Sequence, residues 1–515
     1  MDSNLIFLKP EQNLESEVCN NVPLHHINLV QPHGLLLVID CQDDSYKIVQ
    51  ASENSFQIIG IEVKDLINIS LARLFGENQV SQLFNKLKRW QISNHFPFEI
   101  SWPKTEKKFS GLVHQVNNYF ILEIEPQDAD RTLLPDLLYK EISHLIAIAK
   151  ASASIEKLTQ LAATELKRIS GLDRVMMYKF DRSWNGQVIA EACEPQMEEY
   201  LGLNFPSSDI PKQARELYYK TPYRLIADVN AKPVRLYPIV NPVTNSLTDI
   251  SLCLLRAVPN VHTEYLNNMQ VQASMSTPII IDNKLWGLIS CHNRQPVAPG
   301  FKVRSLFEVF SSILAGQLNS LTIEKKFQHT SLKSGITINI TKNFFQNTSL
   351  KESIAENSAY IMDLLEVEGL AFCLNKTWHH RGNTPDNRQL QNLVKWLSRN
   401  SPNKVSAYDS LPTTYDDAKN FKDIGSGLLA IQLGNNDYLL GFRPEVTYKI
   451  NWGGNPENRI QYDATGSNYH PRNSFKKWQQ LVELSSKSWK EETLEAASQL
   501  RMLILEKMVL LEEIL

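Results

Sequence analysis

The chain has 515 residues, of which 43% are hydrophobic and 21% are charged, and its formal net charge at pH 7 is −3. This composition is typical of a globular protein, and at roughly 150 residues per domain the length predicts three or four domains. Without a basic surplus or a long apolar run, we expect no nucleic-acid partner and no membrane partner. The six scattered cysteines have no C-x-x-C spacing and no signal peptide is recognisable, so we expect no disulfide framework, no metal site and a cytoplasmic location.

The N-terminal part, residues 1–126, is predicted to be a polar arm followed by an α+β domain. Short apolar runs alternate with turn signals over residues 35–125, which is the pattern of short strands. A helix is expected near Glu53–Gly60 and a strand at Tyr119–Ile124. The polar run Pro126–Asp130 is the predicted linker to the next domain.

Residues 127–326 are predicted to form a second α+β domain. It should begin with one long helical segment, Leu137–Ser170, and its apolar runs predict four strands: Arg174–Phe180, Gly186–Glu191, Ser276–Ile281 and Leu285–Cys291. Between the second and third strands, residues 194–260 are rich in Pro, Asn and Asp. A loop region of that length inside a compact domain is usually functional, so we expect a ligand there.

A helix with one apolar face follows, because Val303, Leu306, Phe310 and Ile313 recur at helical spacing. We expect it to run to about Lys326 as a connecting spine, before a third domain at residues 327–488. A last helix is predicted at residues 489–515. Its apolar stripe, Leu500, Ile504, Met508, Leu511 and Leu515, is expected to pair with another copy of the chain or with a downstream segment.

Several motifs stand in a fixed order along the chain. The second domain contains Asn204-Phe205-Pro206-Ser207-Ser208-Asp209-Ile210-Pro211, then the runs His262–Met269 and Leu285–His292. Upstream of it lie Cys19-x-x-x-Pro23-Leu24-His25 and Val30–Gly34, and downstream lie Trp452-Gly453-Gly454 and Pro471-Arg472-x-Ser474-Phe475. In order and spacing these motifs resemble the PAS, GAF and PHY domains of phytochromes, over nearly the whole chain.

The resemblance implies an α+β photosensory module of the bacteriophytochrome type. Its expected architecture is PAS-GAF-PHY, with antiparallel sheets, long connecting helices and a PHY tongue at about residues 440–480. The expected function is red/far-red light sensing by a covalently bound linear tetrapyrrole. Family members usually couple such a module to a histidine kinase and a response regulator, so we expect a parallel homodimer with those partners, and no enzyme activity in this chain itself.

By resemblance, one set of residues would bind the pigment. Arg224 and Arg256 would hold its propionates, since a guanidinium meets a carboxylate with two parallel bonds. Asp209 would offer its backbone carbonyl to the pyrrole N–H groups, His262 would lie over those rings, and His292 would contact the carbonyl of ring D. Completing the site would be Tyr218, Ser274 and Ser276 near the propionates, Ile210 and Pro211 beside Asp209, and Tyr178, Tyr200, Phe205 and Tyr265 around ring D.

The attachment site distinguishes the phytochrome subtypes. Plant-type members carry a cysteine next to the GAF histidine, but here that position is Val261, which cannot form a thioether. Cys19 occupies the position of the bacteriophytochrome nucleophile, which implies biliverdin as the pigment. The alternative for Cys19 is an unreactive thiol in the arm. Two departures from the family are Ile27-Asn28 in place of Pro-Gly, and Pro259-Asn260 in place of Ser-Pro.

In the tongue, Arg472 is expected to pair with Asp209, and Ser474 belongs to the same signalling motif. Val446–Ile450 alternates like a strand, while Ser474–Trp478 could continue as a helix, so two folds of the tongue are conceivable. Two other functions compete with light sensing. One is a GAF sensor of another small molecule such as a cyclic nucleotide, and the other is a dimerisation scaffold without pigment.

Overall fold

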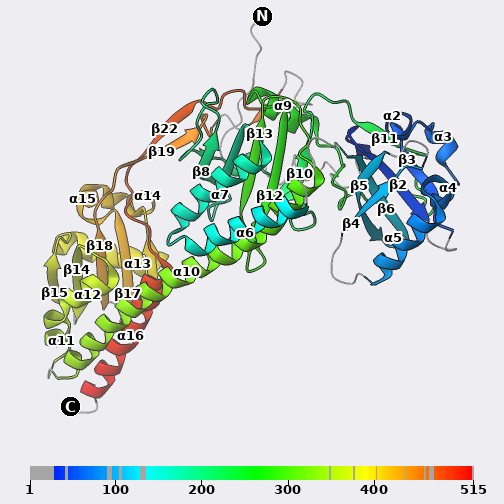
Figure 1. The fold of residues 1–515 in the computed structure, drawn as a ribbon. Helices are drawn as coiled ribbons and strands as arrows, with labels where there is room; N and C mark the ends of the chain where they lie inside the picture. The colour runs from blue at the N-terminus through cyan, green and yellow to red at the C-terminus, as the bar shows by residue number, and fades with distance from the viewer. Residues whose placement is uncertain are drawn as a thin grey trace, which may run out of the picture. The chain divides into compact units, whose positions relative to one another are not determined.

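The structure is a computed structural model that describes residues 28–40, 45–89, 95–103, 107–127, 135–346, 349–374, 377–401, 403–434, 437–457, 460–462 and 469–512 (Figure 1). The chain divides into two compact units. The first comprises residues 1–321 and 451–478, and the second comprises residues 322–450 and 479–515. Cys19 lies outside the described residues, so its predicted role stays a prediction.

The first domain is built on an antiparallel sheet in the order β1-β11-β3-β2-β6-β5-β4. Its own strands are β1 (Leu29–Val30), β2 (Leu35–Asp40), β3 (Lys47–Ser52), β4 (Phe96–Ser101), β5 (Lys108–Val116) and β6 (Tyr119–Pro126). The helices are α2 (Ser55–Ile59), α3 (Val63–Leu66), α4 (Leu71–Phe75) and α5 (Glu77–Arg89). Residues of these helices pack with one face of the sheet into a single apolar core. The expected helix near Glu53–Gly60 and the strand from Tyr119 are confirmed.

The other face of this sheet is covered by the loop-rich region of the second domain. The strand β11 (Val234–Tyr237) pairs with β1 and with β3, at Leu29↔Arg235 and Leu236↔Ser52. Ile250, Cys253 and Leu255 pack with sheet residues in a second apolar cluster. The expected functional loop therefore joins the two domains.

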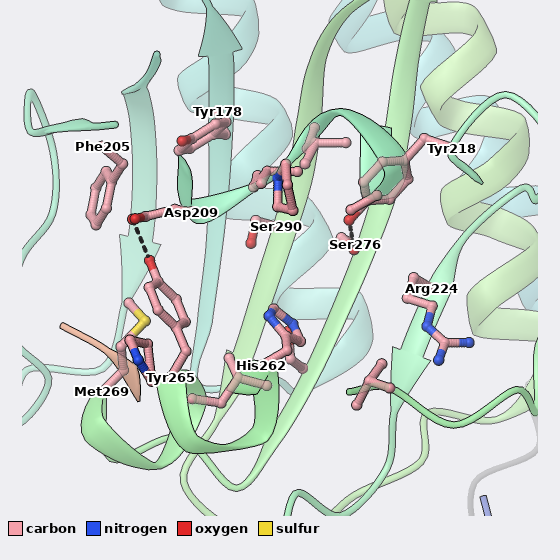
Figure 2. A pocket seen from close by; sticks show the side chains of 18 of the residues that line it. Tyr178, Phe205, Asp209, Tyr218, Arg224, His262, Tyr265, Met269, Ser276 and Ser290 are labelled. Carbon is pink, nitrogen blue, oxygen red and sulfur yellow. Dashed lines mark hydrogen bonds between the residues drawn. The ribbon is translucent and has the colours of Figure 1, made fainter. Parts of the chain in front are cut away.

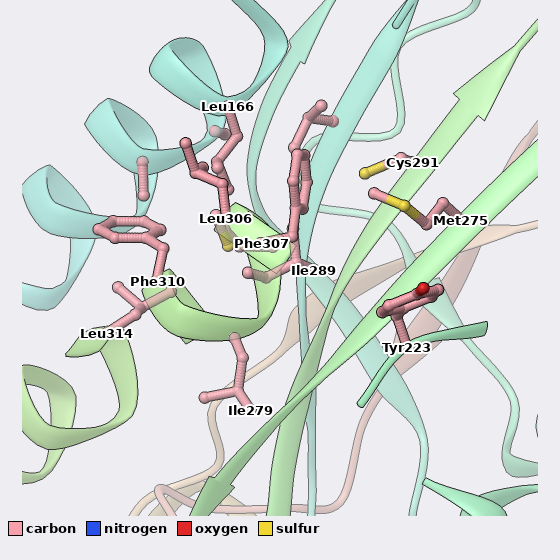
Figure 3. Packing of buried hydrophobic residues seen from close by; sticks show 14 of the residues in the cluster. Leu166, Tyr223, Met275, Ile279, Ile289, Cys291, Leu306, Phe307, Phe310 and Leu314 are labelled. Carbon is pink, nitrogen blue, oxygen red and sulfur yellow. The ribbon is translucent and has the colours of Figure 1, made fainter. Parts of the chain in front are cut away.

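The second domain has its own largely antiparallel sheet, in the order β10-β12-β13-β7-β8-β9, extended by the tongue strands. The strands are β7 (Arg174–Phe180), β8 (Gly186–Cys193), β9 (Asn204–Phe205), β10 (Arg224–Ile226), β12 (Ala273–Ile281) and β13 (Lys284–Asn293). Three helices, α6 (Pro135–Ala151), α7 (Ile155–Ser170) and α10 (Phe301–Phe344), contribute to the core on one face of it. Figure 3 shows Phe307, Phe310 and Leu314 of α10 packed between Leu166 and the sheet residues Ile279 and Ile289.

The prediction of one helix over Leu137–Ser170 is wrong in one respect, because the segment is broken into α6 and α7. Ser154 lies in extended backbone, and its side chain accepts a hydrogen bond from the backbone N–H of Lys157 at 3.2 Å. Such a serine caps the start of a new helix by binding an N–H that has no partner in the first turn. The preceding helix ends at Ala151, and the hydroxyl of Ser152 donates to the carbonyl of Ile148.

The helix α10 is longer than predicted: it continues beyond Lys326 to Phe344. Ile340 and Phe344 are fully buried in the core of the second unit, which explains why the helix persists through a polar stretch. Among the described residues it is the one helix long and apolar enough to be a candidate membrane span. Because Phe307, Leu314 and Leu318 are fully buried in a protein core, its first half behaves as a core helix.

The second unit contains an antiparallel sheet in the order β15-β14-β18-β17-β16. Its strands are β14 (Gly369–Leu374), β15 (Thr377–Gly382), β16 (Val405–Tyr408), β17 (Gly427–Gln432) and β18 (Tyr438–Arg443). The helices are α11 (Leu350–Glu356), α12 (Ser358–Leu365), α13 (Asn387–Asn400), α14 (Leu411–Thr414), α15 (Lys422–Gly425) and α16 (Glu491–Glu512), with a 3₁₀ segment at Asp416–Phe421. Together with antiparallel sheets in both units, these helices confirm the predicted α+β class.

The apolar stripe of the last helix does not have the predicted partner. Leu500 and Ile504 are 2% and 0% exposed, and they pack with α12 and β17 residues of their own unit. Met508 lies against the same core. For these three residues the prediction of pairing with a second copy is wrong, because they pack within their own unit. Leu511 is half-buried, and Leu515 lies outside the described residues.

The predicted tongue is in a strand conformation. Its strands are β19 (Tyr448–Gly453), β20 (Ile460–Tyr462), β21 (Tyr469–Pro471) and β22 (Lys477–Val482). Trp452 of β19 pairs in parallel with Asn204 of β9, and β20 pairs antiparallel with β21. Ser474–Trp478 is not helical here, because β22 begins at Lys477.

Candidate functional site

A pocket lies between the sheet of the second domain, α8 (Lys212–Leu217), α9 (Asn260–Asn268), the short 3₁₀ segment Ser207–Asp209 and the tongue (Figure 2). Every residue that the sequence nominated for pigment contact lines it. These are Tyr178, Tyr200, Phe205, Asp209, Ile210, Pro211, Tyr218, Arg224, Arg256, His262, Tyr265, Ser274, Ser276 and His292. Figure 2 shows Arg224 at the opposite end of the pocket from Phe205 and Tyr265. The two ends therefore differ in chemistry.

One end is aromatic. The ring centroids of Tyr178 and Phe205 lie 6.1 Å apart, and those of Tyr200 and Phe205 lie 5.7 Å apart at a steep angle. Tyr178 can lie flat on its neighbouring strand only because residue 186 is glycine: a Cβ there would be 1.7 Å from the Tyr178 ring. Arg174, which is buried and paired with Glu191 at 2.9 Å, lies 4.1 Å from the centre of the Tyr200 ring. Buried contacts thus fix the aromatic wall from behind.

Asp209 connects the pocket to the tongue. Its carboxylate accepts a hydrogen bond from the Arg472 guanidinium, and the two side chains are 6% and 3% exposed. The hydroxyl of Tyr265 donates to the same Oδ2 atom at 2.8 Å. Burial lowers the pKa of Arg472, but the charge of Asp209 together with the contributions of Tyr265 and Tyr178 outweighs burial, so the pKa of Arg472 is raised. The predicted contact between Asp209 and Arg472 is present.

The tongue motif has a steric basis. Arg472 also donates to the carbonyl of Gly453 and lies 4.8 Å from the centre of the Phe475 ring. A Cβ on Gly453 would be 2.8 Å from the Phe205 ring, and one on Gly454, at φ 91°, would be 2.2 Å from the Ser474 carbonyl oxygen. The two glycines allow the tongue to approach the pocket this closely. Ser474 itself is exposed and does not line the pocket.

The other end of the pocket is cationic. Arg224 and Arg256 both line it, and Arg224 donates to the carbonyl of Leu254 at 3.2 Å and to the carbonyl of Arg256. Burial and the charge of Arg256 hold the pKa of Arg224 well below its ordinary value. Within the described part of the chain, Arg224 makes no ion pair. An anionic group in the pocket would lower the free-energy cost of burying the charge of Arg224, since a buried charge needs a partner.

Serines and a tyrosine surround this cationic end. Arg224 and Ile226 of β10 pair with Ser276 and Ser274 of β12, so the two serines share one face of the sheet. The hydroxyls of Tyr218 and Ser276 lie 2.7 Å apart. This end therefore offers hydroxyl donors beside two guanidiniums, which suits a carboxylate ligand.

Two histidines face the pocket between its ends. Burial, followed by the charge of Arg224, lowers the pKa of His262 to about 4, and burial with the charge of Arg174 lowers the pKa of His292 to about 3. Both imidazoles are therefore neutral, with one N–H donor and one acceptor nitrogen each. His292 is 5% exposed, yet its Nδ1 atom has no hydrogen-bond partner in the described part of the chain. An unsatisfied buried nitrogen that lines a pocket indicates a ligand contact.

The sequence interpretation missed other lining residues, including Met176, Met269 and Ser290. Alternation along the strands could have identified two of them. Met176 is two residues from Tyr178 in β7, and Ser290 is two residues from His292 in β13, so each shares a face with a nominated residue. Met269 follows α9 and carried no comparable signal.

Asn28, at a departure from the phytochrome pattern, and Val261, which distinguishes the subtype, are both informative. Asn28 has φ 54°, the left-handed conformation that glycine adopts readily and that asparagine tolerates, so a residue other than glycine is accommodated at this turn. Val261 lines the pocket, where a plant-type cysteine would stand. None of the four cysteines in the described residues, Cys193, Cys253, Cys291 and Cys373, lines the pocket.

Three family models match consecutive parts of the chain. A PAS fold matches residues 19–127, a GAF domain matches residues 154–318, and the phytochrome region matches residues 335–513. Among curated proteins, the chain is 37% identical to cyanobacterial phytochrome B of Nostoc sp., over 95% of the chain and 65% of that protein. It is 30% identical to a bacteriophytochrome of Xanthomonas campestris pv. campestris, over 95% of the chain and 78% of that protein. The chain thus spans about two thirds of the length of such relatives.

Solved structures agree with these matches. A bacteriophytochrome of the photosynthetic bacterium R. palustris superposes with a TM-score of 0.84 at 30% identity, covering 95% of this chain and 99% of that one. The photosensory core of the Stigmatella aurantiaca phytochrome superposes with a TM-score of 0.82 at 29% identity, covering 95% and 98%. The predicted PAS-GAF-PHY architecture is confirmed. The motifs, the fold and these relatives place the chain in the phytochrome family of photoreceptors.

Proposed function

We propose that this chain is the photosensory module of a bacteriophytochrome, a red/far-red photoreceptor that holds biliverdin covalently through Cys19. Its domains would be residues 1–126, 127–326 and 327–488, with an output helix at residues 489–515. In a longer protein it would form a parallel homodimer in the cytoplasm and regulate a histidine kinase with its response regulator. The chain itself would carry no enzyme activity.

The polarity of the pocket is the observation that supports this function. Arg224 and Arg256 provide two positive charges at one end, and aromatic rings around Phe205 close the other end. A linear tetrapyrrole has two propionates on its middle rings and an uncharged conjugated ring at its end. Its propionates match the cationic end of the pocket, and its end ring matches the aromatic end. A cyclic nucleotide has a single phosphate with one negative charge, so it offers this end of the pocket half the anionic charge of two propionates.

When bound, the pigment would supply light absorption and isomerisation of a double bond. The chain's residues would hold it and respond. Arg224 and Arg256 would fix the propionates, with Tyr218, Ser274 and Ser276 beside them. The backbone of Asp209 and the ring of His262 would contact the pyrrole nitrogens, with Ile210 and Pro211 alongside. His292, Tyr178, Tyr200, Phe205 and Tyr265 would surround ring D.

Attachment through Cys19 is supported by the places of the described thiols. Val261 provides no nucleophile, and none of the described cysteines, Cys193, Cys253, Cys291 and Cys373, lines the pocket. Burial also raises the pKa of Cys253 and Cys291, which disfavours their thiolates. Cys19 and Cys41 lie outside the described residues, and of these two Cys19 occupies the position of the family's nucleophile.

Incubation of the pigment-free chain with biliverdin tests the function. We expect a strong far-red absorption band, and we expect Arg224→Gln to weaken reversible biliverdin binding by about 10- to 100-fold, since a hydrogen bond to a charged group contributes about 1.5–3 kcal/mol. The matched control is Arg294→Gln, because Arg294 is exposed and pairs with Asp173 away from the pocket. Equal loss of affinity in both variants, or binding of a cyclic nucleotide in place of biliverdin, would refute the proposal.

A further inference from the structure

A second group of reactive side chains lies outside the pigment pocket, on the face of the first domain's sheet that the loop-rich region covers. One ligand atom from each of His95, His114 and Glu123 lies within 4.8 Å of the other two, and the three side chains are 8%, 1% and 3% exposed. Cys253, which is fully buried, places its Sγ atom 3.9 Å from Nε2 of His114. Two imidazoles, a carboxylate and a thiol therefore meet in a closed interior.

The register of the sheet brings the first three together. In the β5–β6 pair, His114 is opposite Ile121 and Leu112 is opposite Glu123, so the side chains of His114 and Glu123 lie diagonally on the same face. His95 immediately precedes β4, and its ring centroid is 5.2 Å from that of His114. The loop that carries Cys253 covers this face. The group therefore consists of residues from four separate parts of the chain.

Hydrogen bonds fix the tautomer of His95 and use one oxygen of Glu123. Nε2 of His95 donates to the backbone carbonyl of Leu252 at 2.7 Å, so the proton is on Nε2 and the lone pair is on Nδ1. This is the outer-shell bond that metal-binding histidines commonly make. Oε2 of Glu123 accepts from the N–H of Leu255 at 2.6 Å, whereas Oε1 of Glu123 and Nδ1 of His114 have no hydrogen-bond partner among the described residues. Buried polar atoms without partners are rare, and an ion would satisfy these two.

The charges of the ligands also suit a divalent cation. Such an ion would compensate one carboxylate and one thiolate, leaving a neutral site in the interior.

We propose that His95, His114, Glu123 and Cys253 bind one divalent transition-metal ion, with zinc preferred. Nitrogen, carboxylate oxygen and thiolate sulfur are the ligands that tetrahedral zinc takes, and such ligand atoms lie about 3.3–3.6 Å apart. Binding requires the side chains to draw together by about 1 Å from the separations seen here. The ion would fasten the loop Ile250–Arg256 to the first domain, and Arg256 of that loop lines the pigment pocket.

Zinc retention by the full chain, purified without pigment so that no tetrapyrrole competes for the ion, tests the proposal. We expect one zinc per chain after gel filtration, measured by elemental analysis, and at least tenfold less in His114→Gln. The matched control is His144→Gln, an exposed histidine outside the group. Far-ultraviolet circular dichroism checks that each variant is folded. Failure of the parent to retain zinc, or equal retention by both histidine variants, would overturn the site.

Cobalt as the probe tests the thiolate ligand separately. With Co²⁺ we expect a near-ultraviolet charge-transfer band from thiolate to metal, and we expect Cys253→Ser to remove it. Cys193→Ser, at a partly exposed cysteine outside the group, should keep the band. Hydrogen exchange at Leu255, whose N–H already binds Glu123, should slow at least tenfold when zinc is added. A cobalt band that survives in Cys253→Ser would contradict the ligand assignment.

Discussion

The carboxylate of Asp209 and the guanidinium of Arg472 form a buried ion pair between the pocket and the tongue, 263 residues apart in the sequence. The tongue is in its strand form when this pair is made. Removing one partner of a buried ion pair typically costs about 3–5 kcal/mol, which is enough to bias an element whose two folds differ by a few kcal/mol.

Arg472→Ala should therefore shift the tongue away from its strand form and change the lifetime of one of the two light states. Covalent attachment of pigment should be unchanged, because Arg472 does not belong to the arm that carries Cys19. Infrared difference spectra on illumination report tongue refolding through the amide bands. A matched control is Glu264→Gln, which removes the exposed contact to His470 of the tongue at 3.0 Å and should change the lifetime much less. Equal effects of the two substitutions would count against the ion pair.

Cys19→Ser should leave biliverdin bound but removable by denaturation, since the pocket contacts survive while the thioether cannot form. Zinc-induced fluorescence of the pigment on a denaturing gel measures this. Cys373→Ser, at a buried cysteine of the second unit, is the control that should keep its covalent band. Covalent pigment that persists in the Cys19 variant would move the attachment elsewhere.

Acidification should destabilise the pigment-free chain through its pocket histidines. The pKa values of His262 and His292 fall from 6.5 in the unfolded chain to about 4 and about 3 in the folded one. Between these values the unfolded chain binds more protons, so the contribution of these two histidines to the free energy of unfolding should be constant above pH 6.5 and fall below it. The expected slope is about 1.4 kcal/mol per pH unit for each histidine.

Urea denaturation at pH 7.5 and 5.5 measures this slope. His292→Gln should reduce this slope by about 1.4 kcal/mol per pH unit, the contribution of one histidine. His144→Gln, at an exposed position, should leave the slope unchanged. The same slope in the parent and in His292→Gln would show that His292 is protonated in the folded chain.

Gly186→Ala should damage the aromatic end of the pocket, because the new methyl group would overlap the Tyr178 ring. We expect weaker biliverdin binding together with a loss of stability of about 1–3 kcal/mol, as is usual for overpacking. Gly316→Ala is the control: nothing lies within 4 Å of its Cβ position in α10, and alanine favours helix there. Thermal denaturation with and without pigment compares the stability and the biliverdin binding of the two variants. Unchanged binding in Gly186→Ala would refute the steric role of this glycine.

Dimer formation should depend on α10, since Leu500 and Ile504 of the α16 stripe are buried in their own unit. Ile323, Phe327 and Ile338 are 58%, 72% and 67% exposed, and spacings of 4 and 11 residues place them on one helix face. Phe327→Glu should convert the dimer to monomer in sedimentation experiments, and Met502→Glu, on the exposed side of α16, should not. A parent chain that is monomeric at high concentration would contradict the proposed dimer.

Most of the site could be predicted because its residues occur in local motifs. Asp209 and Pro211, or His262 and Tyr265, are separated by a few positions, so one short segment carries several contacts. Strand alternation would have added Met176 and Ser290. The proposed metal ligands could not be found in this way, since His95, His114, Glu123 and Cys253 meet only through sheet register and the covering loop.

Helix boundaries and partners were less predictable. A serine inside an apolar helical pattern can continue a helix or cap a new one, and at Ser154 its side chain binds the backbone of Lys157. The stripe from Leu500 is equally suited to a second copy or to its own domain, because both offer an apolar surface. Tertiary packing decides such cases, and a single sequence does not contain it.

The central claim is that the pocket holds biliverdin as a light switch. The most direct test is the absorption difference spectrum of the biliverdin-loaded chain under alternating red and far-red light. We predict a far-red absorbing state that converts to a second state and returns, over repeated cycles, with pigment still covalently bound. A far-red band that does not change with light, or no band after biliverdin is added, would contradict the claim.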